Sequence, residues 1–327
     1  MNLGRAKELL DRFSGKRVVV IGDVMLDEYI WGQASRISPE APVIVVDAER
    51  HSQVPGGAAN VVNNLCALGG VGVIFGVVGD DDAGKLLTQA LADEGADTVG
   101  LLVEQGRPTT RKTRVFAHSQ QVVRVDHERR GPISDDTATR LLISLREIIV
   151  SADAILISDY QKGVLVPSVL DGAIAIAREN NKPVTGNLKP AAFPGRCQAT
   201  VITLNLHEAS LAVSGRQLTS KDDIEEVGFS LLARTGSENI LITLGSQGLT
   251  LFSAGSREAF HVNPRPVEVY DTAGAGDTVI STMTLALASG ATPQEAVQLA
   301  NDAAAQAVKK VGVATVTREE ILAIAAD

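Results

Sequence analysis

Short runs of apolar residues alternate with longer helical patterns along most of the chain. The apolar runs lie near residues 18–21, 73–78, 154–157, 201–202 and 240–242, and valine and isoleucine dominate them. Segments with helical periodicity lie between them, near residues 58–68, 83–94, 135–150, 167–180 and 221–234. A strand that is apolar at every position is covered on both faces, and strands that alternate with helices form parallel sheets. The pattern therefore predicts an α/β fold with a doubly wound, mostly parallel sheet flanked by helices.

Two segments, residues 28–49 and 109–126, break this rhythm because polar and apolar residues alternate in them. A period of two is typical of strands with one open face. Turn-forming residues near 36–40 and 118–120 would divide each segment into two strands. We expect the two insertions to form a small separate sheet, the lid, on a single domain that covers residues 1–327.

Charge and cysteine content narrow the classes of function. The net charge of −9 argues against nucleic acid or an anionic membrane as a partner. The two cysteines, Cys66 and Cys197, lie far apart in the sequence, and residues 1–13 have the pattern of a charged amphipathic helix. No signal peptide, transmembrane span or zinc site is indicated, so we expect a cytoplasmic protein.

The segment from Asp271 to Asp277 places small residues between two carboxylates, directly before an apolar run. Small residues let the backbone approach a phosphate closely, and a helix that begins there directs N–H groups and a positive dipole end toward it. Asp277 would then sit where negative charge is stabilised, which suits a base that takes a proton from an attacking hydroxyl. The alternative is an ordinary glycine-rich turn with an acidic residue at a helix start.

Two segments have the glycine spacing of common nucleotide-binding motifs, but their other residues do not fit those motifs. Residues 79–86 have the glycine and lysine spacing of a P-loop, yet three aspartates stand in the loop, and Leu86 replaces the serine or threonine that binds Mg²⁺. Gly70, Gly72 and Gly76 imitate a dinucleotide fingerprint, but the segment 73–78 reads as a strand where that motif needs a helix.

A series of motifs across almost the whole chain resembles the ribokinase-type (PfkB) carbohydrate kinases, in the order found in that family. These motifs are Gly-Gly-Ala-Ala-Asn at 56–60, residues 76–84, Asn-Leu-His-Glu at 205–208, Thr-Leu-Gly-Ser-Gln-Gly at 243–248, and residues 271–278. The resemblance implies a ribokinase-like fold, ATP and Mg²⁺ as cofactors, and phosphorylation of a sugar hydroxyl.

Three further segments narrow the resemblance to the heptose 7-phosphate kinases of lipopolysaccharide core synthesis. They are residues 35–43, Ser-Asp-Tyr-Gln-Lys-Gly at 158–163, and Gln120-Gln121 with Arg124 and Asp126. This implies phosphorylation of the anomeric hydroxyl of D-glycero-D-manno-heptose 7-phosphate to the 1,7-bisphosphate. Many such enzymes carry a fused C-terminal nucleotidyltransferase, and because this chain ends at Asp327 we expect the monofunctional kinase. The alternatives are a kinase of another sugar or sugar phosphate and a nucleotide-binding regulator without catalysis.

The resemblance also assigns roles to the residues around the reacting groups. Asp277 matches the family's catalytic base, and the backbone of the segment before it would form an anion hole for the phosphate. The anion-hole residues are Ala273, Gly274, Ala275 and Gly276. A monovalent cation is implied near Asp271. Asn205 and Glu208 match the motif that organises Mg²⁺ through water, although an asparagine followed three residues later by a glutamate is also a capping box.

The remaining motif positions divide between ATP and the sugar. The residues matched to ATP binding are Asn187, Lys189, Asn205, Thr243, Gly245 and Gly248. The residues matched to the sugar are Asp27, Gly56, Gly57 and Asn60, since a carboxylate and an amide suit hydroxyl groups. Asp23 follows the first strand as well, either near the sugar or as a cap of the strand end.

A basic group must hold the remote phosphate of a sugar phosphate. The candidates in the lid and nearby loops are Arg36, Arg111, Lys112, Arg114, Arg124 and Lys162, of which Arg111 and Lys162 are our leading choices. Isolated lid strands with an open apolar face are marginal in water. We therefore expect a homodimer through the lids.

Overall fold

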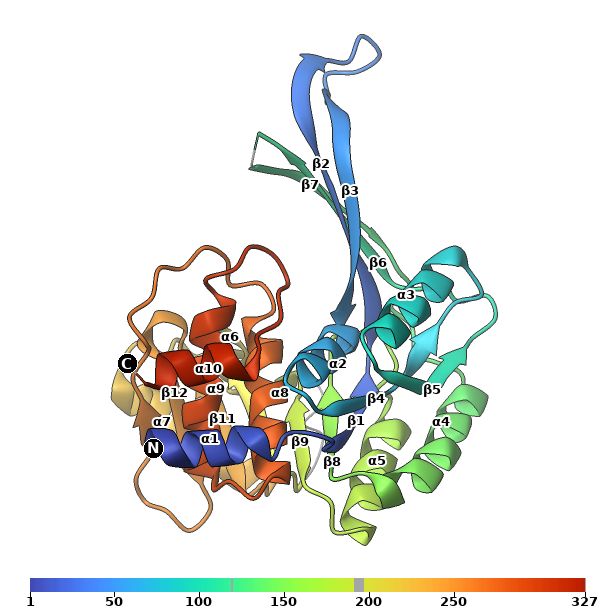
Figure 1. The fold of residues 1–327 in the computed structure, drawn as a ribbon. Helices are drawn as coiled ribbons and strands as arrows, with labels where there is room; N and C mark the ends of the chain where they lie inside the picture. Colours follow the sequence, from blue (N-terminus) through green and yellow to red (C-terminus); the bar gives the residue numbers. More distant parts are fainter. Residues whose placement is uncertain (119, 191–196, 327) are drawn as a thin grey trace.

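The computed structural model describes residues 1–118, 120–190 and 197–326. A nine-stranded sheet forms its centre, in the order β13-β12-β11-β10-β9-β8-β1-β4-β5 (Figure 1). Its strands are β1 (Arg17–Gly22), β4 (Val71–Val78), β5 (Asp97–Val103), β8 (Ala154–Ser158), β9 (Val184–Asn187), β10 (Val201–Asn205), β11 (Asn239–Thr243), β12 (Leu249–Ser253) and β13 (Phe260–Val262). All neighbours from β5 to β11 pair in parallel, and only β12 and β13 are antiparallel.

Helices cover both faces of this sheet. They are α1 (Leu3–Asp11), α2 (Ala58–Ala67), α3 (Asp82–Asp93), α4 (Asp135–Ile148), α5 (Pro167–Glu179), α6 (Leu206–Ala212), α7 (Lys221–Thr235), α8 (Ala275–Ala288), α9 (Pro293–Ala307) and α10 (Arg318–Ala325). The five helices predicted between the strands correspond to α2, α3, α4, α5 and α7, with ends within three residues of the expected ones. Within the described residues, none of the helices is long and apolar enough to cross a membrane.

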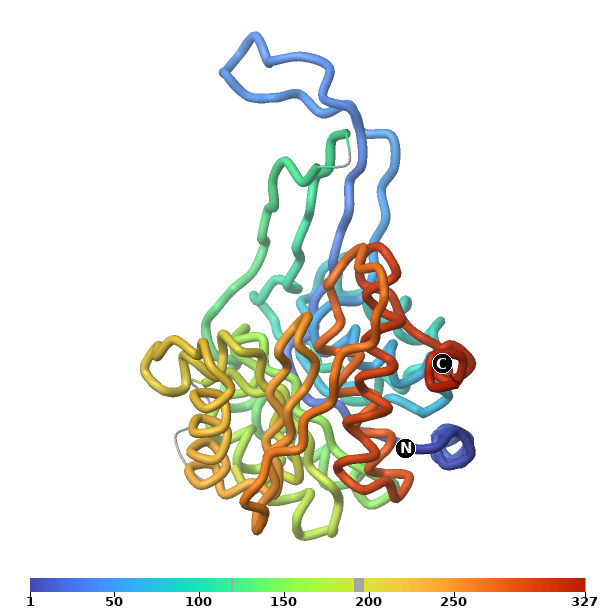
Figure 2. Tube along the Cα trace, turned by 90° about the vertical axis from the view of Figure 1, so that its left-hand side faces the viewer, coloured from blue at the N-terminus to red at the C-terminus, as the bar shows by residue number. Residues whose placement is uncertain are grey.

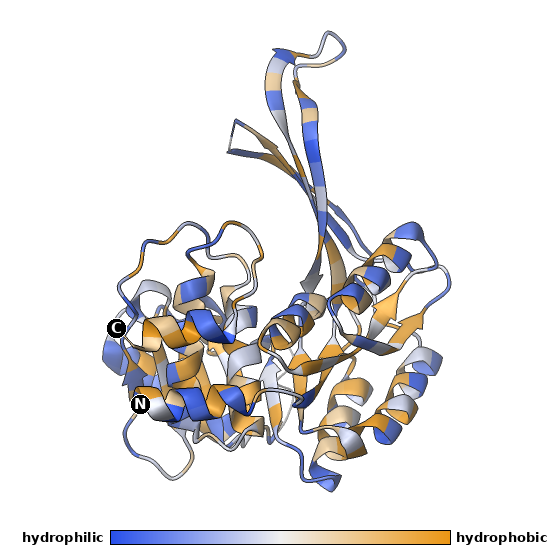
Figure 3. Ribbon diagram, viewed as in Figure 1, coloured by the Kyte–Doolittle hydropathy of each residue, from blue (hydrophilic) through white to orange (hydrophobic). Residues whose placement is uncertain are grey.

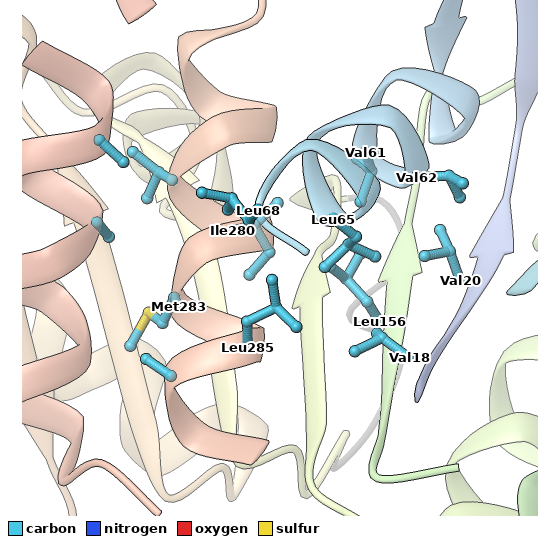
Figure 4. Close-up of a cluster of buried hydrophobic side chains, with 14 of the residues drawn as sticks. Val18, Val20, Val61, Val62, Leu65, Leu68, Leu156, Ile280, Met283 and Leu285 are labelled. Atoms are coloured by element: carbon cyan, nitrogen blue, oxygen red, sulfur yellow. The ribbon is translucent and has the colours of Figure 1, made fainter. Parts of the chain in front are cut away.

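Strand β1 shows why its apolar run is continuous. Val18 and Val20 belong to the hydrophobic core on one face, while Val19 and Ile21 belong to the core on the other. Figure 4 shows the first of these cores, in which Leu65 of α2 and Ile280 of α8 lie in the same cluster as the two valines. Both faces of the strand are therefore covered by helices, and every position has to be apolar.

The lid is a separate four-stranded sheet in the order β3-β2-β6-β7. Its strands are β2 (Val24–Ile37), β3 (Ile44–Gly57), β6 (Arg111–Ala117) and β7 (Gln120–His127). Figures 1 and 2 show it projecting from the body of the molecule in two perpendicular views. The second strand of the first insertion is longer than predicted, because β3 continues to Gly57 and leads directly into α2.

The two faces of the lid carry different side chains, and Figure 3 shows the resulting mixture of polar and apolar positions along its strands. On the inner face, Asp27 pairs with Lys112 and Tyr29 with Arg114 in the register of β2 and β6. Trp31 belongs to the same face, since its ring stacks on that of Tyr29. This face looks across a cavity of about 980 Å³ toward Asp271 and residues 311–313 of the body. The outer face carries the intervening residues of each strand.

Candidate active site

A cavity of about 200 Å³ lies where the parallel strands end. Carboxyl ends of parallel strands and helix starts meet at the same edge of such a sheet, which is where α/β folds bind ligands. The lining residues are Tyr160, Asn187, Lys189, Thr203, Leu204, Asn205, Glu208, Thr243, Gly274, Gly276, Asp277 and Val279. The fold thus brings together residues from the ends of β9, β10 and β11 with the beginning of α8.

Asp277 lies in the first turn of α8 and is only 6% exposed. Its Oδ1 accepts a hydrogen bond of 2.6 Å from the Tyr160 hydroxyl, and its Oδ2 accepts one of 2.7 Å from Asn60 Nδ2. Burial raises the pKa of this carboxyl above its usual value, while the hydrogen bonds from Tyr160 and Asn60 act in the opposite direction. A buried carboxylate with a raised pKa is suited to accept a proton.

The segment before Asp277 is an open turn at the start of α8. A side chain at Gly276 would meet no atom within 4 Å, so free space lies in front of this part of the helix start. Two of the four predicted anion-hole amides already have acceptors in the protein: Ala273 N–H donates to Asp271 Oδ1, and Ala275 N–H to the carbonyl oxygen of Thr272. Of the two glycines in this segment, free space therefore lies beside Gly276, whereas a Cβ on Gly274 would lie 3.2 Å from Asn60 Nδ2.

Asp271 also binds a second loop. Its Oδ2 accepts a hydrogen bond of 2.9 Å from the amide of Gly312, so the carboxylate joins the turn before α8 to the segment between α9 and α10. This is a structural role that the sequence did not indicate. A monovalent cation near Asp271 stays a prediction.

Asp27 occupies the base of the lid and is buried. Its Oδ1 receives a hydrogen bond of 2.8 Å from Arg114 Nη1. Gly56 is required beside it, because a Cβ added there would lie 2.4 Å from Asp27 Oδ2. Gly57 ends β3, and Asn60 stands in the first turn of α2. The sequence matched Asn60 to the sugar, and the structure shows that its amide also donates to Asp277.

Asp23 is an anchor for the loop after β8. Its side chain accepts hydrogen bonds from three backbone amides, those of Tyr160, Lys162 and Val164, at 2.9 to 3.0 Å. Of the two roles considered from the sequence, the structure supports the structural one. The loop that carries Tyr160 is thereby fixed to the end of β1.

Tyr160 is a site residue to which sequence reasoning gave no role. The only signal was its place in the Ser-Asp-Tyr-Gln-Lys-Gly segment. Its hydroxyl meets Asp277, and the amines of Lys112 and Lys189 lie 6.0 and 5.6 Å from its ring centroid. Tyr160 therefore lies between the base of the lid and the phosphate side of the cavity.

Asn205 and Glu208 form a capping box at the start of α6: each side chain accepts a hydrogen bond from the backbone amide of the other residue. Glu208 also forms an ion pair with Lys189 and lines the cavity. The capping role is thus real, and it fixes the Glu208 carboxylate at the edge of the site. Groups of three or more metal-binding side chains are absent from the described residues.

The other residues matched to ATP lie on the same side. Asn187 and Thr243 end β9 and β11 and line the cavity beside Lys189. Gly245 and Gly248 belong to the turn between β11 and β12. Gly248 has a φ of 89°, and a Cβ there would lie 2.1 Å from the carbonyl oxygen of Val262, so no other residue fits this turn.

Arg111 and Lys162, our leading candidates for binding the remote phosphate, do not lie together in the structure. Arg111 lies on the outer face of the lid, where its Nε is 3.7 Å from Glu28 Oε2, because its position in β6 differs by one residue from that of Lys112. Lys162 forms an ion pair of 2.7 Å with Glu128. Lys112 faces Asp27 on the inner face, and burial, followed by repulsion from Lys162, lowers its pKa.

A buried carboxylate at a helix start, a cavity beside it and a lid with inward polar groups are the arrangement expected of a carbohydrate kinase. Residues 16–320 match the model of the pfkB family carbohydrate kinases. The chain belongs to this family.

Solved structures confirm the ribokinase-like fold. Ribokinase from Arabidopsis thaliana, complexed with ribose and ATP, has a TM-score of 0.76 and 20% identity over 95% of this chain and 99% of that chain. Phosphofructokinase-2 from Escherichia coli in complex with potassium has a TM-score of 0.77 and 22% identity over 95% and 98% of the two chains.

Sequence relatives are closer in identity. The bifunctional protein HldE of Desulfatibacillum aliphaticivorans is 45% identical over 311 residues, which cover 95% of this chain and 63% of that protein. HldE of Caulobacter vibrioides is 43% identical over 314 residues, covering 96% of this chain and 64% of that protein. The chain therefore spans a little under two thirds of the length of these relatives.

Proposed function

We propose that this chain transfers the γ-phosphoryl group of ATP to the anomeric hydroxyl of D-glycero-D-manno-heptose 7-phosphate. The observation that carries the proposal is Asp277, a buried carboxylate at a helix start beside a cavity lined by Lys189 and Glu208. The heptose-kinase segments at 35–43 and 158–163 and the identity to HldE support this choice of sugar. The reaction would contribute to lipopolysaccharide core synthesis in the cytoplasm, as expected from the sequence.

In the proposed reaction, the sugar lies between Asp277 and the base of the lid, where Asp27 can accept hydrogen bonds from its hydroxyls. An Asp277 oxygen takes the proton of the anomeric hydroxyl as that oxygen attacks the γ-phosphorus of ATP. The bond between the γ-phosphorus and the bridging oxygen breaks, and ADP leaves. Phosphoryl transfer depends mainly on alignment and on neutralisation of charge, which the start of α8 and Lys189 would supply.

The described residues fit Mg²⁺ only as a partner of ATP. Both oxygens of Glu208 already have protein partners, namely Lys189 and the amide of Asn205. Mg²⁺ usually keeps several waters and is held by one or two carboxylates together with substrate phosphates. Glu208 and Asn205 would therefore hold it through water, and the ion would neutralise the charge on the ATP phosphates.

The second phosphate of the sugar would bind at the base of the lid. Lys112 lies on the inner face near Tyr160, and no ion pair to it is found in the part of the chain that the structure describes. Lys162 is close enough to lower the pKa of Lys112. A dianionic phosphate between these amines would remove their repulsion, so we propose Lys112 and Lys162 as the phosphate ligands, with Arg124 next to them.

The substrate assignment is tested by a coupled kinase assay with several sugar phosphates. We expect kcat/KM for heptose 7-phosphate to exceed the values for mannose and fructose phosphates by at least about a hundredfold, because polar groups built for one substrate are left unpaired by another. An equal or higher value for another sugar phosphate would contradict the heptose assignment and leave the kinase assignment intact.

We also propose that two lids pair in a homodimer. Val123 and Val125 on β7 are 46% and 55% exposed on the outer face, and Ile37, Val43 and Ile44 at the lid tip are exposed as well. These exposed apolar side chains lie on β7 and at the tip of the lid, which projects from the body, and a second lid would cover them with an identical surface.

The Val123→Asp variant should be monomeric, because an aspartate in a paired apolar sheet face would be buried without a partner. Sedimentation at micromolar protein concentration checks this. The control is Val99→Asp, which changes a valine that is 54% exposed on β5, a strand of the central sheet rather than of the lid, and should leave the dimer intact. A wild-type protein that sediments as a monomer would contradict the proposal.

A further inference from the structure

Each oxygen of the Asp277 carboxylate has its own hydrogen-bond donor. The Tyr160 hydroxyl binds Oδ1 at 2.6 Å, and Asn60 Nδ2 binds Oδ2 at 2.7 Å. Hydrogen bonds to an ionised acceptor are short and strong. The carboxylate cannot rotate about its Cβ–Cγ bond without losing both of them.

A series of buried, hydrogen-bonded side chains connects Asn60 to α8. Asn64, one turn later on α2, donates from Nδ2 to the backbone oxygen of Asn60 at 2.9 Å and to its Oδ1 at 3.3 Å. Thr278 Oγ1 donates to Asn64 Oδ1 at 2.8 Å, which is shorter than its 3.3 Å contact with the Gly274 carbonyl oxygen. Asn64 and Thr278 are completely buried.

Only one orientation of the two asparagine amides gives every donor in this series of hydrogen bonds an acceptor. Since Asn60 Oδ1 accepts from Asn64, the Asn60 amide must turn its Nδ2 toward Asp277. Asn64 is turned in the same way, because its Nδ2 meets the Asn60 carbonyl oxygen, which can only accept, and its Oδ1 therefore faces Thr278. The hydrogen bonds therefore run from Thr278 in α8 through Asn64 and Asn60 in α2 to Asp277, the residue directly before Thr278.

The Tyr160 side is fixed as firmly. The Tyr160 amide donates to Asp23 Oδ2, and the same carboxylate holds the amides of Lys162 and Val164. Asp23 is 1% exposed. The backbone of the loop that carries the tyrosine is therefore held by the residue that follows β1.

We propose that Tyr160, Asn64 and Thr278 are positioning residues that orient Asp277 toward the sugar hydroxyl. The inference rests on the proposed function, in which Asp277 is the base. A displacement of about 1 Å in a reacting group can reduce the rate by about a hundredfold. A carboxylate held at both oxygens is protected from such displacement.

The hydrogen bonds that Tyr160 and Asn60 donate also act on the charge of Asp277. They lower its pKa and thereby oppose the effect of burial; among the charged groups, Lys189 lowers this pKa and Asp27 raises it. Loss of a donor should raise the pKa of Asp277. Because the base must be ionised to accept a proton, activity would then be lost at a higher pH as the solution is acidified.

The test uses Tyr160→Phe and Thr278→Val, each of which removes one hydroxyl with little change in volume. We expect kcat to fall about tenfold or more in each, with little change in the KM for ATP. The acidic limb of the pH profile of kcat should move to higher pH. Thr278→Ser, which keeps the hydroxyl, should restore both properties and shows whether the valine variant failed for reasons of folding.

The matched control is Thr284→Val, on the same helix. Thr284 is also completely buried, and its hydroxyl lies 2.7 Å from Thr185 Oγ1, outside the chain that reaches Asp277. This variant should keep the wild-type kcat and pH profile. A change as large as that of Thr278→Val would mean that any lost hydroxyl in α8 disturbs the site, and would overturn the proposal.

A second measurement does not depend on the substrate. The side-chain carbon of Asp277, assigned by its disappearance in Asp277→Asn, can be titrated by NMR in the free protein. Its midpoint should be higher in Tyr160→Phe and Thr278→Val than in the wild type; unchanged midpoints and kcat values would overturn the proposal. An active Asp277→Asn enzyme would instead refute the base assignment of the proposed function.

Discussion

Replacing Asp277 with asparagine should abolish phosphoryl transfer while ATP and sugar still bind. The amide is nearly isosteric but cannot accept the proton, and general-base catalysis contributes about 10²–10⁴-fold to the rate. The carboxylate accepts from both Tyr160 and Asn60, whereas an amide has one accepting atom only, so one donor would face an N–H group. Misalignment should therefore add to the chemical loss. Steady-state kinetics and calorimetric titration with ATP measure the two effects.

The control for this prediction is Asp302→Asn. Asp302 is also a buried aspartate on a helix, but it pairs with Arg265, and neither residue lines the cavity. It should retain most of the wild-type kcat. If Asp277→Asn keeps more than about a tenth of the wild-type kcat, Asp277 is not the base.

Replacing Lys112 or Lys162 with alanine should reduce kcat/KM for heptose 7-phosphate by at least tenfold, which corresponds to about 1.4 kcal/mol. Binding energy from a phosphate far from the reacting hydroxyl can orient the sugar, so kcat should fall as well as affinity. The KM for ATP should stay nearly unchanged. The comparison substrate is heptose without its phosphate, on which the variants and the wild type should differ little.

The Arg111→Ala variant tests whether the phosphate ligand is Lys112, as the structure suggests, or Arg111, as the sequence suggested. Arg111 neighbours Lys112 in β6 but lies on the outer face beside Glu28. We expect this variant to behave like the wild type on both sugars. Loss of activity in Arg111→Ala alone would restore the sequence-based choice, and equal losses on both sugars in Lys112→Ala would assign that lysine to folding or to ATP.

The central fold could be predicted because each of its elements carries a strong local pattern. The buried strands β1, β4 and β8 are apolar at nearly every position, and the helices between them have an apolar stripe. The antiparallel edge formed by β12 and β13 was not predicted. β13 is three residues long and only half-buried, so its sequence has little reason to differ from that of a loop.

Some residues of the candidate site could be predicted from the sequence, and others could not. Asp277 and its glycines stand in one continuous motif, and the structure places them together at the cavity. Tyr160 and Asn64 were missed, since a single tyrosine or asparagine in a helix or loop has no local pattern that separates a site residue from a structural one. Asn205 and Glu208 could be read as a capping box or as a metal motif, and the structure shows that a capping box also lines the cavity.

The sequence alone determined the α/β architecture, the existence of the lid and the carboxylate at the start of α8. These depend on periodicity and on residue types close together in the chain, which act over short distances. Only the tertiary structure decided that Tyr160 and Asn60, 100 residues apart, donate to the two oxygens of Asp277. It also decided which lid residues face the site. A shift of one residue along a strand reverses the face of every side chain, and register is fixed by packing of the whole sheet.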